Sequence, residues 1–378
     1  MRICYFGQAA SIHVRRWAEW FASRGHEILL ITPPTTERVE GFRVVHAPID
    51  RAFFIPRPRL LARIRRIVRE FRPDLVHAHY VLGYGMYAAL SGAEPLVVSA
   101  WGGDIAKAPA ESFLARRVAR LVLRRADLIH VGDEDSLATV ARLGGDPSRC
   151  FVQAWGVDTK EFSPERRDPG FRASLCPEDE LLFVSNRSLE PSFNHEVVLR
   201  AARDLAARAT GFRIAIAGSG SEGPRLRHLA GNWGLDKIVT FLGRLPPDRM
   251  PVLYSSGDVY VDAFSLQVPG HGTSVSLMEA MACGLPPVVA ERPGLGGLIQ
   301  DGVSGFFFRG TDSAQLARIM QELVGSRDLV ARVGGEARRR ACERGDMERN
   351  LRAFEAQMTT LLADRHGRQG GVRGDPSP

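Results

Sequence analysis

The sequence predicts an α/β protein made of two Rossmann-like domains that face each other across a cleft. Each half of the 378-residue chain begins with a short apolar strand pattern, a loop of small residues and a helix pattern. Strand and helix patterns then alternate through both halves, and this alternation is typical of doubly wound parallel sheets. The chain is also long enough for two to three domains with substantial cores.

The composition is that of a soluble globular protein and argues against several other classes of protein. Apolar residues make up 44% of the chain without any run long enough to span a membrane. The N-terminal residues begin a strand too early for a secretory signal. The five cysteines form no CxxC or Cys/His cluster, so we expect a cytoplasmic protein with reduced thiols and no zinc site. The net charge of +7 comes from arginines spread along the chain without a basic-aromatic motif, so we expect no nucleic-acid partner.

The first half follows the order expected of a doubly wound domain. We predict a strand over 2–6, a loop over 7–11, a helix over 12–24, and further strands over 26–32, 73–80, 95–100 and 126–131. The opening loop lacks the GxGxxG motif, which argues against a dinucleotide site. His77 and His79 share one face of their strand, but no third ligand lies at a metal-binding spacing. We therefore expect no metal site.

A strongly basic amphipathic helix is predicted over 57–72. Its apolar residues recur at helical spacing, and seven arginines occupy the other positions. Such a helix is most often the solvated face of a Rossmann-like domain. The alternative is a peripheral contact with an anionic membrane, at the inner face of the cell membrane.

The second half contains the stretch that carries the most chemistry. Its predicted strands cover 181–185, 212–217, 238–243, 259–264, 287–290 and the end of 302–308. The strand over 259–264 leads into a Pro- and Gly-containing loop, and Thr273 is a suitable N-cap for a helix over 274–283. The first N–H groups of that helix, at Ser274, Val275 and Ser276, lack helical acceptors and favour an anion such as phosphate. Glu279 would accept hydrogen bonds from sugar hydroxyls of the same ligand, although an ordinary helix with a surface Glu is the alternative.

The segment GTSVSLMEAMACGLPPVV, residues 272–289, resembles the donor-site motif of retaining GT-B glycosyltransferases of family four. The resemblance assigns Glu279 to the donor ribose and places His271 where the family has a first Glu. It assigns Arg187 to the donor diphosphate, whereas the Lys that usually follows is missing from 189–194. The helix tip at 274–276 would then carry more of the charge. Gly218 follows the strand over 212–217, where the backbone of a glycine could approach a ligand closely or simply form a turn. The resemblance places Leu245 in the segment whose backbone meets the nucleobase.

The N-terminal half resembles the acceptor side of the same family in three segments. GQAASIHVRRWAEWFASRGHEI (7–28) is similar to the family's first unit, which places Gly7, Gln8 and His13 at the cleft, although we favour a packing role for His13. VHAHYVLGYG (76–85) is similar to the acceptor-side segment, with His79 and Tyr84 near the reacting sugar. SAWGGDI (99–105) matches at Asp104, which the resemblance makes a base or a polar partner of the transferring sugar. Trp101 replaces the usual His and would stack on a sugar.

The acidic run at 133–135 contains the pattern Asp-x-Asp, which is typical of metal sites in the other major glycosyltransferase fold. We reject that interpretation because these acids precede a helix, where they suit the helix dipole. The preceding strand, 126–131, matches the last strand of a GT-B N-terminal domain instead.

The resemblance covers nearly the whole chain and predicts its domains and its function. The N-terminal domain would cover 1–164 and the donor domain 165–345. A helix over 346–365 would pack back on the first domain, and 366–378 would be a disordered tail. The implied activity is the metal-independent transfer of a hexose, with retention, from a UDP- or GDP-type sugar to an acceptor hydroxyl in glycan, glycolipid or secondary-metabolite biosynthesis. No cofactor is implied beyond this co-substrate.

Two alternatives to a transferase remain open at this point. His271, Trp101 and the missing Lys would suit a non-catalytic sugar-nucleotide binding or partner protein. A nucleotide-sugar epimerase shares the GT-B fold, but the N-terminal segments match the transferases better.

Overall fold

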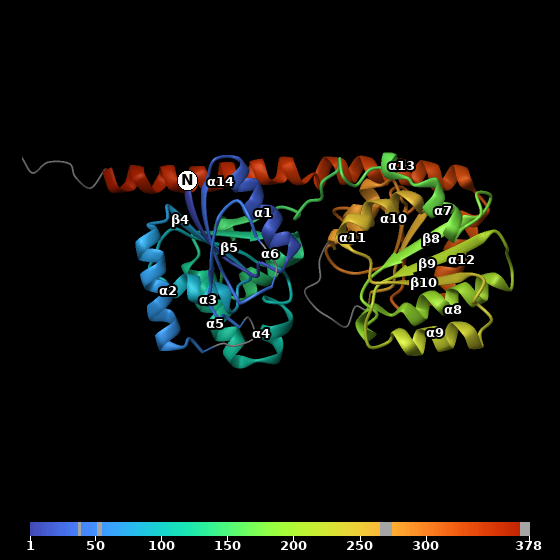
Figure 1. The fold of residues 1–378 in the computed structure, drawn as a ribbon, viewed down its shortest axis with the longest axis horizontal. Helices are drawn as coiled ribbons and strands as arrows, with labels where there is room; N and C mark the ends of the chain where they lie inside the picture. The colour runs from blue at the N-terminus through green and yellow to red at the C-terminus, as the bar shows by residue number, and fades with distance from the viewer. Residues whose placement is uncertain (37–38, 51–54, 265–273, 371–378) are drawn as a thin grey trace, which may run out of the picture. The chain divides into compact units, whose positions relative to one another are not determined.

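The computed structural model describes residues 1–36, 39–50, 55–264 and 274–370, with side chains up to residue 365. The chain forms two compact units (Figure 1). The first comprises Met1–Gln153 and the chain from Leu351 onward, and within the described residues the second spans Ala154 to Asn350. The boundary therefore lies before the predicted one at residue 164.

The first unit contains a seven-stranded sheet in the order β3-β2-β1-β4-β5-β6-β7, in which every neighbouring pair is parallel. The strands are β1 (Arg2–Phe6), β2 (Glu27–Thr32), β3 (Arg43–His46), β4 (Leu75–His79), β5 (Leu96–Ser99), β6 (Leu128–Val131) and β7 (Cys150–Val152). The prediction of 126–131 as the last strand is wrong, because β7 follows it and pairs with β6. Both missed strands, β3 and β7, are short edge strands without a clear apolar pattern.

Helices cover both faces of this sheet. They are α1 (Ile12–Ser23), α2 (Pro58–Phe71), α3 (Tyr84–Leu90), α4 (Lys107–Glu111), α5 (Phe113–Arg125) and α6 (Glu134–Arg142). The pleat of β4 sends Val76 and Ala78 into a core shared with α2, α3 and α5. His77 and His79 point to the opposite face, where Trp17 of α1 packs against them. The side chain of Asp133 accepts a hydrogen bond from the Ser136 amide as the N-cap of α6, which confirms that the acidic run starts a helix.

The second unit contains a six-stranded parallel sheet in the order β10-β9-β8-β11-β12-β13. Its strands are β8 (Leu181–Asn186), β9 (Phe212–Ala217), β10 (Val239–Gly243), β11 (Val259–Asp262), β12 (Pro287–Ala290) and β13 (Phe306–Phe308). Its helices are α7 (Pro169–Leu175), α8 (His195–Ala206), α9 (Gly223–Asn232), α10 (Met250–Ser256), α11 (Val275–Ala282), α12 (Ser313–Val324) and α13 (Arg327–Arg344). One core lies between the sheet and α8, α9 and α12, and a second core contains residues of α10, α11 and α13. The predicted α/β class with two Rossmann-like domains is confirmed.

The last helix, α14 (Met347–Gly370), joins the first unit from Leu351 onward. Phe354 is fully buried, and its ring centroid lies 5.0 Å from that of Trp17 and 5.3 Å from that of His77. Glu355 pairs with Arg24 at 2.8 Å. In the structure the helix continues through 366–370, where the start of a disordered tail was expected. Residues 371–378 lie outside the described residues, so the tail stays a prediction there.

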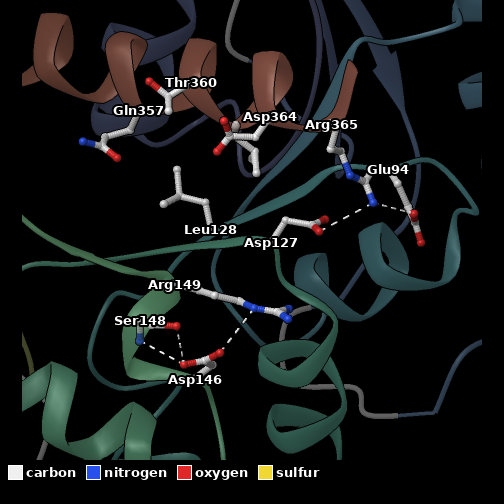
Figure 2. Close-up of a pocket in the computed structure, with 11 residues that line it drawn as sticks. Glu94, Asp127, Leu128, Asp146, Ser148, Arg149, Gln357, Thr360, Asp364 and Arg365 are labelled. Carbon is white, nitrogen blue, oxygen red and sulfur yellow. Dashed lines mark hydrogen bonds and ion pairs between the residues drawn. The ribbon is translucent and has the colours of Figure 1, made fainter. Parts of the chain in front are cut away.

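Near its C-terminal end α14 borders a polar cavity of about 700 Å³ in the first unit (Figure 2). Arg365 reaches Glu94 at 2.7 Å and Asp127 at 3.6 Å, and Arg149 pairs with Asp146 at 3.5 Å. The two ion pairs of Arg365 anchor the helix just before residue 366, and composition alone gives no sign of them. Among the described residues, no helix is long and apolar enough to cross a membrane.

Candidate active site

Arg187, the predicted diphosphate ligand, follows β8 at the carboxyl end of its strand. Its Nη1 donates to Ser276 Oγ at 3.0 Å, and its Nε lies 3.9 Å from Asp262 Oδ1. The guanidinium also stacks 4.5 Å from the Phe193 ring centroid. Burial is the largest single influence and lowers the pKa of Arg187, but Asp262 and two nearby tyrosines together outweigh it, so the pKa is raised overall. A fixed positive charge therefore lies beside the start of α11.

The start of α11 differs by one residue from the prediction. Ser274 is the N-cap, and its Oγ accepts from the Leu277 amide at 3.1 Å, so the helix begins at Val275 and not at Ser274. Thr273, the predicted cap, and His271 lie outside the described residues. Because Ser274 caps Leu277, the first amides left without a helical acceptor are those of Val275 and Ser276.

The Ser276 hydroxyl links the helix to its surroundings. Ser276 Oγ lies 3.0 Å from Ser274 Oγ and 3.3 Å from the Tyr260 hydroxyl, in addition to its bond from Arg187. Glu279 is half-buried on the same helix, and its charge joins burial in raising the pKa of Tyr254. Leu245 is partly buried against the core that contains α11. The structure thus brings Arg187, Ser274, Val275, Ser276 and Glu279 together within the second unit.

Gly218 has a packing role that the sequence left open. Its φ of +146° is rare for other residues, and a Cβ there would lie 2.2 Å from the Arg187 carbonyl oxygen. The group that approaches Gly218 most closely is the backbone carbonyl of Arg187. Gly218 therefore allows the Arg187 loop to lie directly on the end of β9.

Sequence reasoning missed Asp262 and Arg292. Asp262 ends β11 with no exposed surface, and its Oδ2 accepts from Arg292 Nη2 at 3.0 Å. Burial raises the pKa of Asp262, but Arg187 and Arg292 lower it more, so the pKa is depressed overall. The acid inside the apolar segment VYVDAF was a visible signal for Asp262. Arg292 had no local signal, because its partner lies thirty residues away.

Asp104 lies in the first unit and joins two loops at the carboxyl ends of β4 and β5. Its Oδ1 accepts from the Trp101 amide at 2.9 Å and its Oδ2 from the Val81 amide at 2.6 Å. The side chain is fully buried, and burial raises its pKa to about 6 despite these hydrogen bonds. Both oxygens are occupied by backbone donors, so the geometry favours a positioning role over the role of base.

His79 belongs to a buried cluster of histidines around Trp17. Its ring centroid is 4.4 Å from that of His77, and burial, followed by the charges of His130 and His13, lowers its pKa to about 3. His77 Nε2 lies 2.8 Å from Ser99 Oγ, Ser99 Oγ lies 3.2 Å from His130 Nδ1, and His130 Nε2 lies 2.8 Å from the Gln153 carbonyl oxygen. Since that carbonyl can only accept, His130 donates from Nε2, Ser99 donates to His130, and His77 donates to Ser99. His77 and His130 are therefore neutral, and each is held in one tautomer.

The remaining acceptor-side residues surround the same end of the sheet. A Cβ on Gly7 would lie 3.5 Å from His79 Cβ, so Gly7 packs closely over the histidine cluster. His13 is half-buried with its ring centroid 5.6 Å from that of Trp101, and burial lowers its pKa to about 4. Gln8 and Tyr84 line a separate pocket of about 380 Å³.

Tyr80, immediately after β4, has a φ of +107°. Such a conformation is unusual for a bulky residue and often marks a functional site. Among the described residues no group of three or more His, Cys, Asp or Glu side chains could hold a metal ion.

Two Rossmann-like units, each built on a parallel sheet, with a buried cation beside the start of a helix in the second unit, are typical of the GT-B class of group-transfer enzymes. Residues 2–132 match a family model described as glycosyl transferase 4-like, and residues 167–340 match that of glycosyl transferases group 1. The chain belongs to the glycosyl transferases group 1 family and is a glycosyltransferase. The predictions of family, fold and enzymatic activity are confirmed.

Relatives of known name support this assignment. The D-inositol 3-phosphate glycosyltransferase of Rhodococcus opacus is 30% identical over 369 residues, which cover 88% of this chain and 81% of that protein. A GDP-mannose-dependent phosphatidylinositol monomannoside mannosyltransferase of Mycolicibacterium smegmatis is 25% identical over 364 residues, which cover 90% of this chain and 91% of that protein. In fold, the chain is similar to the Anabaena protein HepE in complex with UDP, with a TM-score of 0.77 and 20% identity over 95% of this chain and 100% of that one.

Proposed function

We propose that this glycosyltransferase uses a nucleoside-diphosphate sugar of the UDP or GDP type and retains the anomeric configuration. The observation that carries the proposal is the contact of Arg187 with Ser276 at the N-terminus of α11. A buried cation and unpaired helical amides at one point attract a diphosphate, because charge-assisted hydrogen bonds and the helix dipole act on it together. The GDP-mannose dependence of one relative and the UDP bound to a structural neighbour support this donor class.

In the proposed mechanism the bond from the anomeric carbon to the diphosphate oxygen breaks while the acceptor oxygen bonds to the same face of the sugar. The acceptor hydroxyl passes its proton to the departing diphosphate. The sugar becomes cationic in the transition state, and Arg187 and the tip of α11 stabilise the negative charge that grows on the diphosphate. These groups neutralise the leaving group without a metal ion or a bound cofactor.

The other predicted residues take supporting roles in this proposal. Glu279 accepts hydrogen bonds from the donor ribose, and the segment at Leu245 meets the base. His271 lies outside the described residues and stays a prediction for the donor-sugar side of the site. In the first unit Asp104 holds the loops after β4 and β5, and the neutral ring of His79 packs beneath them. The acceptor is a hydroxyl-bearing sugar, lipid or small metabolite.

A thermal-shift panel with UDP, GDP, ADP, TDP and CMP, each with and without Mg²⁺, tests the donor class. A ligand at about a hundred times its dissociation constant stabilises the fold by about 2.7 kcal/mol. We expect a shift with one nucleoside diphosphate that is unchanged by Mg²⁺ and absent in Arg187→Gln. The absence of any shift would overturn the proposed donor. NMR of the anomeric proton in the product then tests retention, which an inverted product would overturn.

We also propose that the first unit contacts an anionic membrane through α2. Ile55, just before the helix, is 57% exposed, and Phe113 at the start of α5 is 70% exposed. Exposed arginines of α2 supply charge complementary to anionic lipid. Sedimentation with vesicles of anionic and of neutral lipid tests the contact. Binding to anionic vesicles that falls when Arg59 and Arg66 are both changed to Gln supports it, and equal behaviour with both vesicle types would overturn it.

A further inference from the structure

Three charged side chains meet at the carboxyl ends of three neighbouring strands in the second unit. Arg187 follows β8, Asp262 ends β11 and Arg292 follows β12, and these strands are adjacent in the sheet. Asp262 is 3.9 Å from Arg187 and 3.0 Å from Arg292. Both guanidinium groups also lie over the ring of Phe264, at 5.5 and 5.3 Å from its centroid. The sheet therefore brings two cations to one carboxylate.

The charges in this cluster do not balance. Two arginines and one aspartate leave a net positive charge, although the Arg292 side chain is only 3% exposed and that of Arg187 13%. Within the described part of the chain, the Nε atoms of both arginines are buried and have no hydrogen-bond acceptor. Asp262 carries one negative charge and therefore balances only one of the two arginines. Buried excess charge with unused donors indicates a site for an anion.

We propose that Arg292 is the second cation for the donor diphosphate and binds it together with Arg187. This rests on the proposed function and supplies the charge that the missing Lys in 189–194 would have provided. Asp262 holds both guanidinium groups in place before the ligand arrives. The diphosphate then receives hydrogen bonds from the two arginines and from the amides at the start of α11.

The test compares binding of a nucleoside diphosphate and of the monophosphate with the same base, by calorimetry on the full chain. UDP with UMP and GDP with GMP are the probes. Losing one charged contact to the second phosphate should weaken diphosphate binding about tenfold or more in Arg292→Gln, with little change for the monophosphate. Arg292→Lys should recover part of the loss, because it keeps the charge without the planar fork. Arg225→Gln, which removes an exposed arginine of the same unit, is the matched control and should keep the wild-type ratio.

A double variant separates ligand binding from the pairing with Asp262. In Asp262→Asn/Arg292→Gln the carboxylate and Arg292 are both neutral, so Asp262 does not become an unpaired charge, and Arg187 keeps its hydrogen bond to Ser276. If Arg292 only neutralised Asp262, this variant would regain the wild-type preference for the diphosphate, and that result would overturn the inference. A preference that stays lost supports it. A wild-type chain that binds neither UDP nor GDP would overturn the proposed donor instead, so the two failures are distinguishable.

Discussion

Each unit buries polar groups toward the carboxyl ends of the strands in its own parallel sheet, but the two units stabilise these groups in different ways. In the second unit, Arg187, Asp262 and Arg292 are charged and leave an excess of positive charge. In the first, His77, Ser99 and His130 are neutral and hydrogen bond in series to a backbone carbonyl. In our proposal an anionic ligand completes the charged cluster, whereas the neutral histidine chain is built from its own donors and acceptors.

This difference predicts different sensitivities for the two regions. The charged cluster should respond to ligand and to salt, because its net charge attracts an anion. The histidine cluster should respond to acid, because a neutral buried ring must gain a charge to be protonated.

The largest expected effect is the loss of stability of the first unit in acid. The pKa is about 3 for His79 and about 4 for His130 in the folded protein, below the ordinary value of 6.5. The unfolded chain therefore binds more protons, so this stability is present above pH 6.5 and is lost as pH falls toward 4. At pH 4.5 each ring that stays neutral in the folded protein lowers the free energy of unfolding by about 3 kcal/mol, because one pKa unit corresponds to about 1.4 kcal/mol.

Asp104 acts in the opposite direction over part of this range. Its pKa is raised from 3.8 to about 6, so its contribution is present below pH 3.8 and is lost as pH rises through 6. Several histidines outweigh one carboxyl group, and the net result should be acid destabilisation. Urea unfolding at a series of pH values, followed by tryptophan fluorescence, to which Trp17 in the cluster contributes, measures this destabilisation. Constant stability from pH 7 to 4.5 would contradict the neutral burial of these rings.

A smaller effect should follow from Gly218→Ala, which disturbs the charged region through its backbone. The new Cβ would lie 2.2 Å from the Arg187 carbonyl at a φ of +146°. Strain and displacement together should lower the free energy of unfolding by about 2–5 kcal/mol and move Arg187 away from Ser276. Denaturant unfolding and nucleoside-diphosphate affinity are the measurements.

Gly211→Ala is the matched control for this substitution. Gly211 also has a positive φ, +85°, but a Cβ there would meet nothing within 4 Å. Gly211→Ala should lower the free energy of unfolding by only about 1 kcal/mol and leave nucleotide affinity unchanged. Equal effects of the two substitutions would show that the close approach of the Arg187 backbone is unimportant.

Local patterns predicted most strands of both sheets and the start of α11 to within one residue, but not every contact around them. Strand β1 and the cationic Arg187 follow from apolar runs and a motif within a few residues, and the strand agrees in both bounds. Strand β7 has only three half-buried residues, too few to show a period. The partnership of Arg292 with Asp262 depends on the adjacency of β11 and β12, which no local pattern contains. Sequence periodicity thus predicts helices and strands. The pairing of Asp262 with Arg292 becomes visible only when the order of the strands in the sheet is known.

The smallest predicted effect concerns Asp104, and it separates positioning from proton transfer. Asn keeps one oxygen acceptor, so Asp104→Asn loses one of the two bonds that hold the Val81 and Trp101 amides. The loss of one hydrogen bond should lower kcat by about tenfold and leave donor affinity unchanged. Removal of a general base typically costs about a hundredfold to ten-thousandfold instead. Steady-state rates with the donor found in the thermal-shift panel decide between them, and a fall near a thousandfold with intact loops would make Asp104 the base.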